Sequence, residues 1–154
     1  MSSRTNLAVS PPRKRNLREA IPTWKPTILI AEDSLDAREM MKVFLESRGY
    51  RVLSAENGLR ALQVAVKNHP DAVLLDLQLP KLDGFSVARS LRRLPLFKSL
   101  PIIMLSGHDP SRYRQEAMDA GCDDYLLKPI SFDGLQTVLD RLISREGRVL
   151  VKSA

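Results

Sequence analysis

The chain has 154 residues, 44% of them hydrophobic, with one cysteine and a formal net charge of +6 at pH 7. This length suits one domain with a sizeable core and is short for two, and every apolar run stays far below the roughly 20 residues of a membrane span. The lone Cys122 allows no internal disulfide and no thiolate metal cluster, which predicts a small buried thiol in a cytoplasmic protein.

The positive charge gathers in the first 26 residues, which hold six basic residues and one acidic residue, Glu19. This segment is rich in Ser and Pro and has no sustained apolar period, so residues 1–26 are predicted to form a disordered basic arm. The run Pro11-Pro12-Arg13-Lys14-Arg15 reads as a solvated leader, a contact for an acidic surface or part of a targeting segment. The remaining residues carry 18 basic and 17 acidic side chains, so direct DNA binding by the folded part is not expected.

The first half of the body alternates buried strands with helices. Residues 27–31 predict a strand that ends on Glu32 and Asp33, and a helix follows from Ser34 to Gly49. Its apolar face is expected to hold Met40, Met41, Val43, Phe44 and Leu45. Residues 50–55 predict a more polar strand at a sheet edge, followed by an Asn57-Gly58 turn and a second helix that reaches residues 68–70, marked by Ala61, Leu62, Ala65 and Val66.

The apolar run of residues 72–75 has no polar alternation, which is typical of a parallel strand covered on both faces, and it ends on Asp76. Reaction sites of open α/β sheets lie at this end of the strands, which favours a chemical role for Asp76. The alternative is that Asp76 only caps the following loop, because Asp is a common turn residue.

The second half continues the alternation, with a helix at 85–94, a strand at 101–105 that leads into Ser106, and a helix at 110–120. A short strand at 125–127 ends on Lys128 and Pro129, and a last helix runs from Phe132 to about Glu146. We therefore expect one domain over residues 27–146 and a C-terminal tail over 147–154. Five strands and five helices in this alternation predict a doubly wound α/β parallel sheet with the flavodoxin-like order 2-1-3-4-5.

Polar residues follow four of these strands and should meet at one sheet edge, where strands one and three diverge. Carboxylates at close range repel unless cations join them, and Lys128 supplies one positive charge. Mg²⁺ would supply the remaining positive charge, because it binds one or two carboxylates and a carbonyl together with water. The predicted ligands are Asp33, Asp76 and the backbone carbonyl of Gln78, with Glu32 in the outer shell or bound through water.

A carboxylate beside Mg²⁺, an ammonium and a hydroxyl suits phosphoryl transfer to Asp76, with Lys128 and Ser106 contacting the phosphoryl oxygens. In these residues the chain resembles the receiver domain of two-component response regulators, over roughly residues 27–146. Glu32-Asp33 resembles the acidic pair of that family, Asp76 its phosphoacceptor, Ser106 its switch hydroxyl, Tyr125 its switch aromatic residue and Lys128-Pro129 its lysine and proline.

The resemblance implies a receiver that stands alone and is phosphorylated by a histidine kinase or a histidine phosphotransfer protein, with Mg²⁺ as cofactor and Mn²⁺ as a substitute. Such a protein catalyses its own phosphorylation and dephosphorylation and is not otherwise an enzyme. Its signal leaves by protein contact, through the face of the fourth helix, fifth strand and fifth helix. The resemblance further implies that Gln78 and His108 tune the phosphoryl lifetime, that Ser106 and Tyr125 form the switch, and that the Lys128–Pro129 bond is cis.

Three other functions compete with this interpretation. A phosphatase of the haloacid dehalogenase type also uses an aspartate nucleophile, but it needs a second carboxylate where Gln78 stands. Flavin binding suits the same topology, but the acidic loop at Glu32-Asp33 would repel a phosphate. An adaptor that needs no phosphorylation would use the basic arm to hold an acidic partner.

Overall fold

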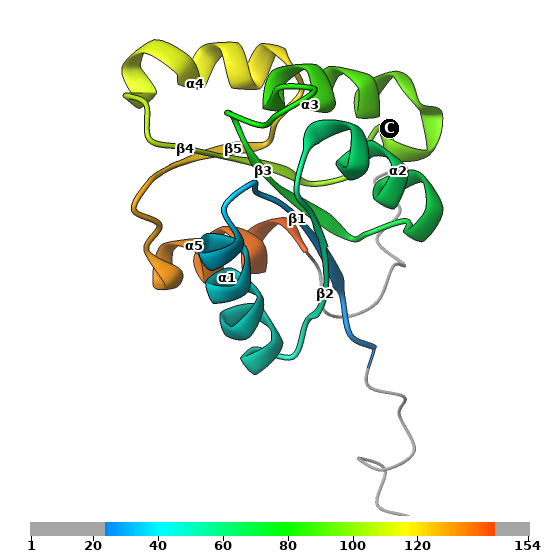
Figure 1. Ribbon diagram of the computed structural model, residues 1–154, viewed down its shortest axis with the longest axis vertical. Coiled ribbons are helices and arrows are strands. Elements are labelled where there is room, and N and C mark those ends of the chain that lie inside the picture. The colour runs from blue at the N-terminus through cyan, green and yellow to red at the C-terminus, as the bar shows by residue number, and fades with distance from the viewer. Residues whose placement is uncertain (1–23, 144–154) are drawn as a thin grey trace, which may run out of the picture.

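A computed structural model describes residues 24–143 and shows one sheet of five parallel strands in the order β2-β1-β3-β4-β5 (Figure 1). The strands are β1 (Thr27–Ala31), β2 (Arg51–Ala55), β3 (Ala72–Asp76), β4 (Ile102–Ser106) and β5 (Asp124–Leu127). The helices are α1 (Leu35–Ser47), α2 (Gly58–Asn68), α3 (Gly84–Arg93), α4 (Pro110–Asp119) and α5 (Phe132–Leu142), with a 3₁₀ turn η1 (Pro95–Phe97). The predicted fold class and strand order are confirmed, and β2 lies at an edge.

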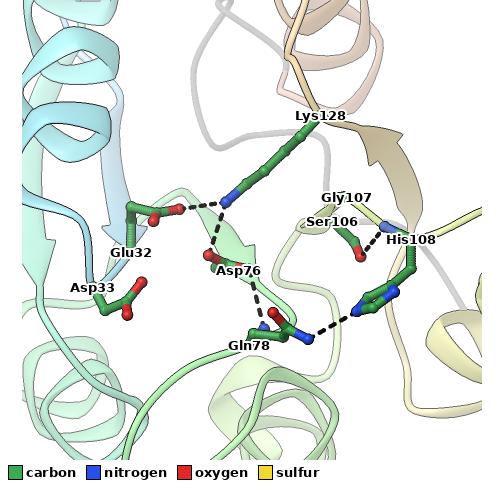
Figure 2. Close-up of a pocket in the computed structure, with 8 residues that line it drawn as sticks. All are labelled: Glu32, Asp33, Asp76, Gln78, Ser106, Gly107, His108 and Lys128. Atoms are coloured by element: carbon green, nitrogen blue, oxygen red, sulfur yellow. Dashed lines mark hydrogen bonds and ion pairs between the residues drawn. The ribbon is translucent and has the colours of Figure 1, made fainter.

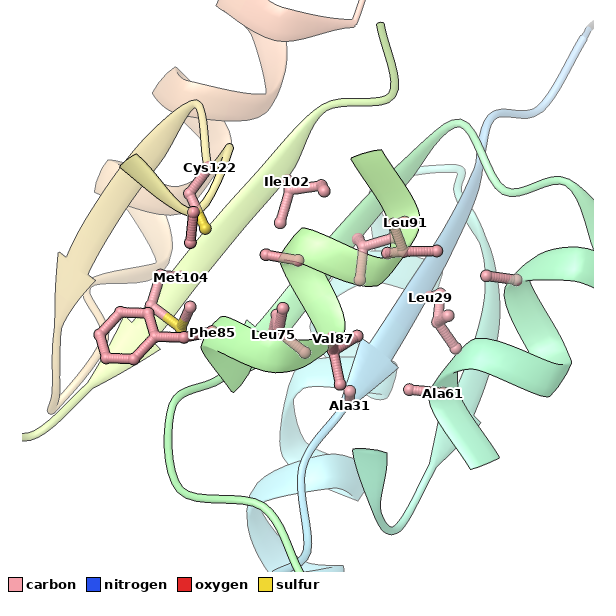
Figure 3. Packing of buried hydrophobic residues seen from close by; sticks show 14 of the residues in the cluster. Leu29, Ala31, Ala61, Leu75, Phe85, Val87, Leu91, Ile102, Met104 and Cys122 are labelled. Carbon is pink, nitrogen blue, oxygen red and sulfur yellow. The ribbon is translucent and has the colours of Figure 1, made fainter. Parts of the chain in front are cut away.

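Helices cover both faces of the sheet, with α2, α3 and α4 on one side and α1 and α5 on the other (Figure 1). Alternate residues of each central strand point to opposite sides, so Leu29 and Leu75 join the core under α2 and α3, while Ile28 and Leu74 join the core under α1 and α5. Figure 3 shows the first of these cores. The uninterrupted apolar runs of the strands follow from this double burial.

Cys122 lies in the first core, as the sequence predicts, and burial raises the pKa of its thiol to about 12. At neutral pH this thiol is therefore protonated and is a poor nucleophile.

Each α-helix begins at a side chain that accepts a hydrogen bond from a backbone N–H of its first turn, which satisfies a donor that has no partner within the helix. These residues are Ser34, Asn57, Asp83, Asp109 and Ser131. The predicted Asn57-Gly58 turn is therefore wrong in detail, because Asn57 is the N-cap of α2 and Gly58 is its first residue.

Several exposed apolar residues correct the predicted helix faces. Met40 and Val43 are 60% and 66% exposed, because the inward stripe of α1 passes through Met41 and Leu45 and the neighbouring positions turn toward solvent. Val66 of α2 is exposed for the same reason. The last helix also ends earlier than predicted, at Leu142, because Ile143 has an extended backbone.

The predicted arm lies almost wholly outside the described residues, and so does the predicted tail. Within residues 24–143, no helix combines the length and the apolar character needed to cross a membrane.

Gly58 allows the start of α2 to pack against the loop that follows β3. A Cβ at this position would lie 1.9 Å from the backbone oxygen of Leu82, and the Gly58 N–H donates to the Pro80 carbonyl at 3.2 Å. We expect Gly58→Ala to lower the free energy of unfolding by about 2 kcal/mol or more, because a backbone atom must move. Urea unfolding measures this loss. Gly134→Ala is the matched control, since its Cβ would meet only Ser131 at 3.5 Å and should stabilise α5 slightly.

Candidate functional site

A pocket of about 430 Å³ opens at the edge of the sheet where the strands end (Figure 2). Its polar side chains come from the last residues of β3 and β4 and from the loops after β1, β3, β4 and β5, so the sheet itself brings them together. They belong to Glu32, Asp33, Asp76, Gln78, Ser106, His108 and Lys128, with Gly107 completing the lining. Every predicted site residue except Tyr125 therefore lines one pocket, and Tyr125 contacts it through His108.

The Lys128 ammonium joins two buried carboxylates. Its Nζ donates to Glu32 Oε2 and to Asp76 Oδ2, both at 2.8 Å, and these residues are only 2% and 6% exposed. The backbone N–H of Gln78 donates to the other Asp76 oxygen, Oδ1, at 3.0 Å. Both oxygens of Asp76 are therefore held, and its carboxylate has a fixed orientation (Figure 2).

Burial and neighbouring charges shift the pKa values of Glu32 and Lys128. Burial raises the pKa of Glu32, the nearby Asp76 carboxylate raises it further, and Lys128 opposes both. Burial favours the neutral form of Lys128, but the hydrogen bonds to Asp76 and Glu32 outweigh it and raise the pKa of the ammonium group. The lysine is therefore a permanent cation of the site near neutral pH.

An acidic cluster beside this lysine fits a hard divalent cation. Glu32, Asp33 and Asp76 each offer a carboxylate oxygen, and these atoms lie within 4.8 Å of one another. One ammonium faces three carboxylates, so the cluster favours a further cation, and oxygen ligands suit Mg²⁺. The Asp33 carboxylate is the exposed member, open to the pocket. The expected role of the Gln78 carbonyl stays a prediction.

The loop after β3 lies tightly against the strand that carries Asp76. The Gly84 N–H donates to the Leu77 carbonyl at 2.9 Å, and a Cβ on Gly84 would lie 2.4 Å from the Asp76 backbone oxygen. Glycine is therefore needed for this close approach. The approach fixes the position of the strand end on which Asp76 lies.

His108 links four parts of the site. Its backbone N–H donates to Ser106 Oγ at 3.0 Å, and its carbonyl accepts the Tyr125 hydroxyl at 2.8 Å. Its ring nitrogen Nε2 lies 2.8 Å from Gln78 Nε2, and the ring centre is 4.9 Å from that of Tyr113 in α4. Gln78 and His108, which are predicted to tune the phosphoryl lifetime, are therefore in direct contact across the pocket (Figure 2). The predicted switch residues Ser106 and Tyr125 both bind the backbone of His108.

Arg38 also supports the site, although it is not among the residues predicted from the sequence. Its Nη1 donates to the backbone carbonyls of Glu32, at 2.8 Å, and Asp33, at 3.3 Å, and so holds the acidic loop after β1. Its position one turn into α1, just beyond an acidic pair, is the sequence signal that points to this role. The predicted cis bond between Lys128 and Pro129 is present.

Comparison with known proteins finds a matching family and similar proteins. The family described as "Response regulator receiver domain" matches residues 28–140. The response regulator MprA of Mycobacterium sp. (strain KMS) is 39% identical over 118 residues, which cover 77% of this chain and 50% of that protein. The chain thus spans about half the length of the curated relatives it matches.

Two solved structures extend the similarity to the fold. The chemotaxis protein CheY4 of Vibrio cholerae aligns with a TM-score of 0.74 and 29% identity, covering 78% of this chain and all of that one. The receiver domain of the sensor histidine kinase PA1611 of Pseudomonas aeruginosa aligns with a TM-score of 0.72 and 34% identity, covering 77% and 98%. The latter structure has a magnesium ion coordinated in its active site cleft.

Proposed function

The chain belongs to the response regulator receiver domain family of two-component systems, and from this we propose that it is a phosphoacceptor that is phosphorylated on Asp76 in a Mg²⁺-dependent reaction. The observation that carries the proposal is the Asp76 carboxylate, which is held by Lys128 and the Gln78 N–H within an acidic cluster at the end of β3. A buried carboxylate with both oxygens oriented is prepared for nucleophilic attack.

In the reaction, a carboxylate oxygen of Asp76 attacks the phosphorus atom of a phosphohistidine donor. A P–O bond forms while the P–N bond breaks, and the electron pair of that bond returns to the imidazole nitrogen of the donor. The Lys128 ammonium and the Ser106 hydroxyl are donors for the phosphoryl oxygens. Ser106 Oγ already accepts the His108 N–H, and its own proton is available to donate.

Asp33 and Asp76 would hold the metal ion, with Glu32 behind them and the Gln78 carbonyl as a further oxygen ligand. When bound, Mg²⁺ supplies positive charge that offsets the charge of the incoming phosphoryl group, and Mn²⁺ can take its place. Glu32 keeps Lys128 in position beside the reacting carboxylate. The protein then acts on no other substrate and catalyses only its own phosphorylation and dephosphorylation, the latter tuned by Gln78 and His108.

The partner expected upstream is a histidine kinase or a histidine phosphotransfer protein. Downstream, we infer a protein contact on the α4, β5 and α5 face in the cytoplasm, without direct DNA binding. Asp124 of β5 supports this face, because its buried carboxylate pairs with Arg114 of α4 and Arg141 of α5. If Ser106 moves toward a phosphoryl group, it gives up the His108 N–H, and Tyr125 on β5 is bound to the same residue.

Acetyl phosphate, a small phosphodonor, tests the reaction. With Mg²⁺ we expect intact-mass spectrometry to show one added phosphoryl group per chain, and hydroxylamine to remove it as it removes acyl phosphates. With EDTA the addition should fall below detection, and Mn²⁺ should restore it. Equal labelling in Mg²⁺ and EDTA, or a label that resists hydroxylamine, would contradict the proposal.

A further inference from the structure

Every charged side chain of α2, α3 and η1 is basic. Residues 57–70 and 84–101 contain no Asp or Glu, whereas α1, α4 and α5 each contain acidic residues. Five exposed cations make up what we call the basic face, and none takes part in a salt bridge of the described chain: Arg60, Lys67, Arg89, Arg93 and Lys98. Because α2 and α3 lie side by side (Figure 1), these cations lie on adjacent elements on one side of the sheet.

A second pocket, of about 290 Å³, lies at the end of the basic face where α2 and α3 finish. Its apolar walls include Leu96, Phe97 and Leu100, and the exposed His69 lies at its rim. Leu96 is 65% exposed, which is a large apolar surface to leave in water. Asp71 also lines the pocket, but its Oδ2 already accepts the Thr27 N–H at 2.7 Å.

The pocket is preformed, because Arg92 holds its outer wall. This arginine donates to the Phe97 carbonyl at 2.7 Å and to the Gly121 carbonyl at 2.8 Å, and it pairs with Asp123 at 3.0 Å. Arg92 thereby ties η1 to the loop before β5. A ligand that binds here meets an η1 backbone that is already held in place, which lowers the cost of ordering it.

We propose that the basic face and this pocket bind an acidic protein segment, which inserts an apolar side chain between Leu96 and His69. Charge complementarity selects such a partner and rejects the ends of this chain, since residues 1–23 and 144–154 both have more basic than acidic residues. The exposed Val66 and Leu94 favour a protein over a nucleic acid. The basic face also presents no exposed Phe, Tyr or Trp on which bases would stack.

This binding does not depend on phosphorylation and goes beyond the proposed function. The second pocket lies where β3 and β4 begin, next to Pro70 and Pro101, whereas Asp76 lies where β3 ends. The second pocket and the pocket around Asp76 therefore lie at opposite ends of the strands.

Fluorescence anisotropy of the full chain with a labelled peptide, in which glutamates flank a central Phe-Leu pair, tests the proposal. Arg93→Glu/Lys98→Glu should weaken binding about tenfold or more, and Leu96→Ser about fivefold. The matched controls lie on α1 and at its C-cap, across the sheet: Lys42→Glu/Arg48→Glu makes the same change in net charge, and Met40→Ser shortens a side chain of similar exposure. Both should bind within about twofold of the parent protein.

Three results would overturn the inference. One is that the Arg93→Glu/Lys98→Glu variant binds the peptide as tightly as the parent protein does. Another is that a peptide whose Phe-Leu pair is replaced by Ser-Ser binds as tightly as the original peptide. The third is binding of duplex DNA or phosphatidylserine vesicles that requires Arg93 and Lys98 while the peptide does not bind. Asp76→Asn should leave peptide binding unchanged. A negative result in the peptide assay therefore does not bear on the proposed phosphorylation of Asp76, and a negative result in the phosphorylation assay does not bear on peptide binding.

Discussion

Asp76→Asn should abolish phosphoryl incorporation from acetyl phosphate and from any phosphohistidine donor. The amide keeps the size of the side chain, and its oxygen can still accept from Lys128 or Gln78, so the fold should be preserved. However, an amide is a far weaker nucleophile than a carboxylate and cannot form an acyl phosphate. Intact-mass spectrometry after incubation with Mg²⁺ and acetyl phosphate measures the loss, which should be complete.

Asp83→Asn is the matched control for this experiment. Asp83 lies in the loop that follows Asp76 but caps α3, where it accepts from the Ser86 N–H at 3.0 Å, and Asn is an equally good N-cap. Labelling of this variant should equal that of the parent protein. If Asp76→Asn were labelled normally, the phosphoacceptor would lie elsewhere and the proposed chemistry would be wrong.

Lys128→Met should slow phosphorylation by acetyl phosphate about a hundredfold, because it removes a fixed positive charge from the site where phosphoryl charge must be stabilised. It should also lower the free energy of unfolding by about 2 kcal/mol, since Glu32 and Asp76 lose the ammonium that lies 2.8 Å from each. Labelling rates under saturating Mg²⁺ and urea unfolding in EDTA measure the two effects. Lys81→Met, an exposed change in the loop after β3, should show neither.

The stability loss in Lys128→Met should grow with pH. Burial already raises the folded-state pKa of Glu32 above 4.5, and the loss of a neighbouring cation raises it further. Above the unfolded pKa the folded variant retains a proton that the unfolded chain releases, so folding becomes less favourable as pH rises. The difference from the parent protein should therefore be larger at about pH 8 than at about pH 5. A constant difference would show that Glu32 is not coupled to Lys128.

The sheet and the composition of the site were predictable because both follow from local sequence. Uninterrupted apolar runs such as residues 72–75 mark doubly buried strands, and the residue that ends each run must lie at the common edge. The exposure of Met40 and Val43 was mispredicted, because an apolar composition alone does not determine which side of α1 faces the sheet. The contacts of His108 were not predictable, since they depend on loop backbone and side-chain rotamers that no periodicity encodes, whereas the position of Arg38 just beyond the acidic pair could have suggested its role.

The ion pair between Glu32 and Lys128 joins residues 96 positions apart in the chain. Its members follow β1 and β5, the first and last strands along the chain, and Asp76 ends β3, which lies between them in the sheet, so the three groups meet only when these strands have assembled. A nascent chain still lacking its last strand, or a proteolytic remnant, would have an acceptor aspartate without its lysine. On the proposed function, a chain that has not completed its sheet should therefore accept a phosphoryl group far more slowly than the folded protein.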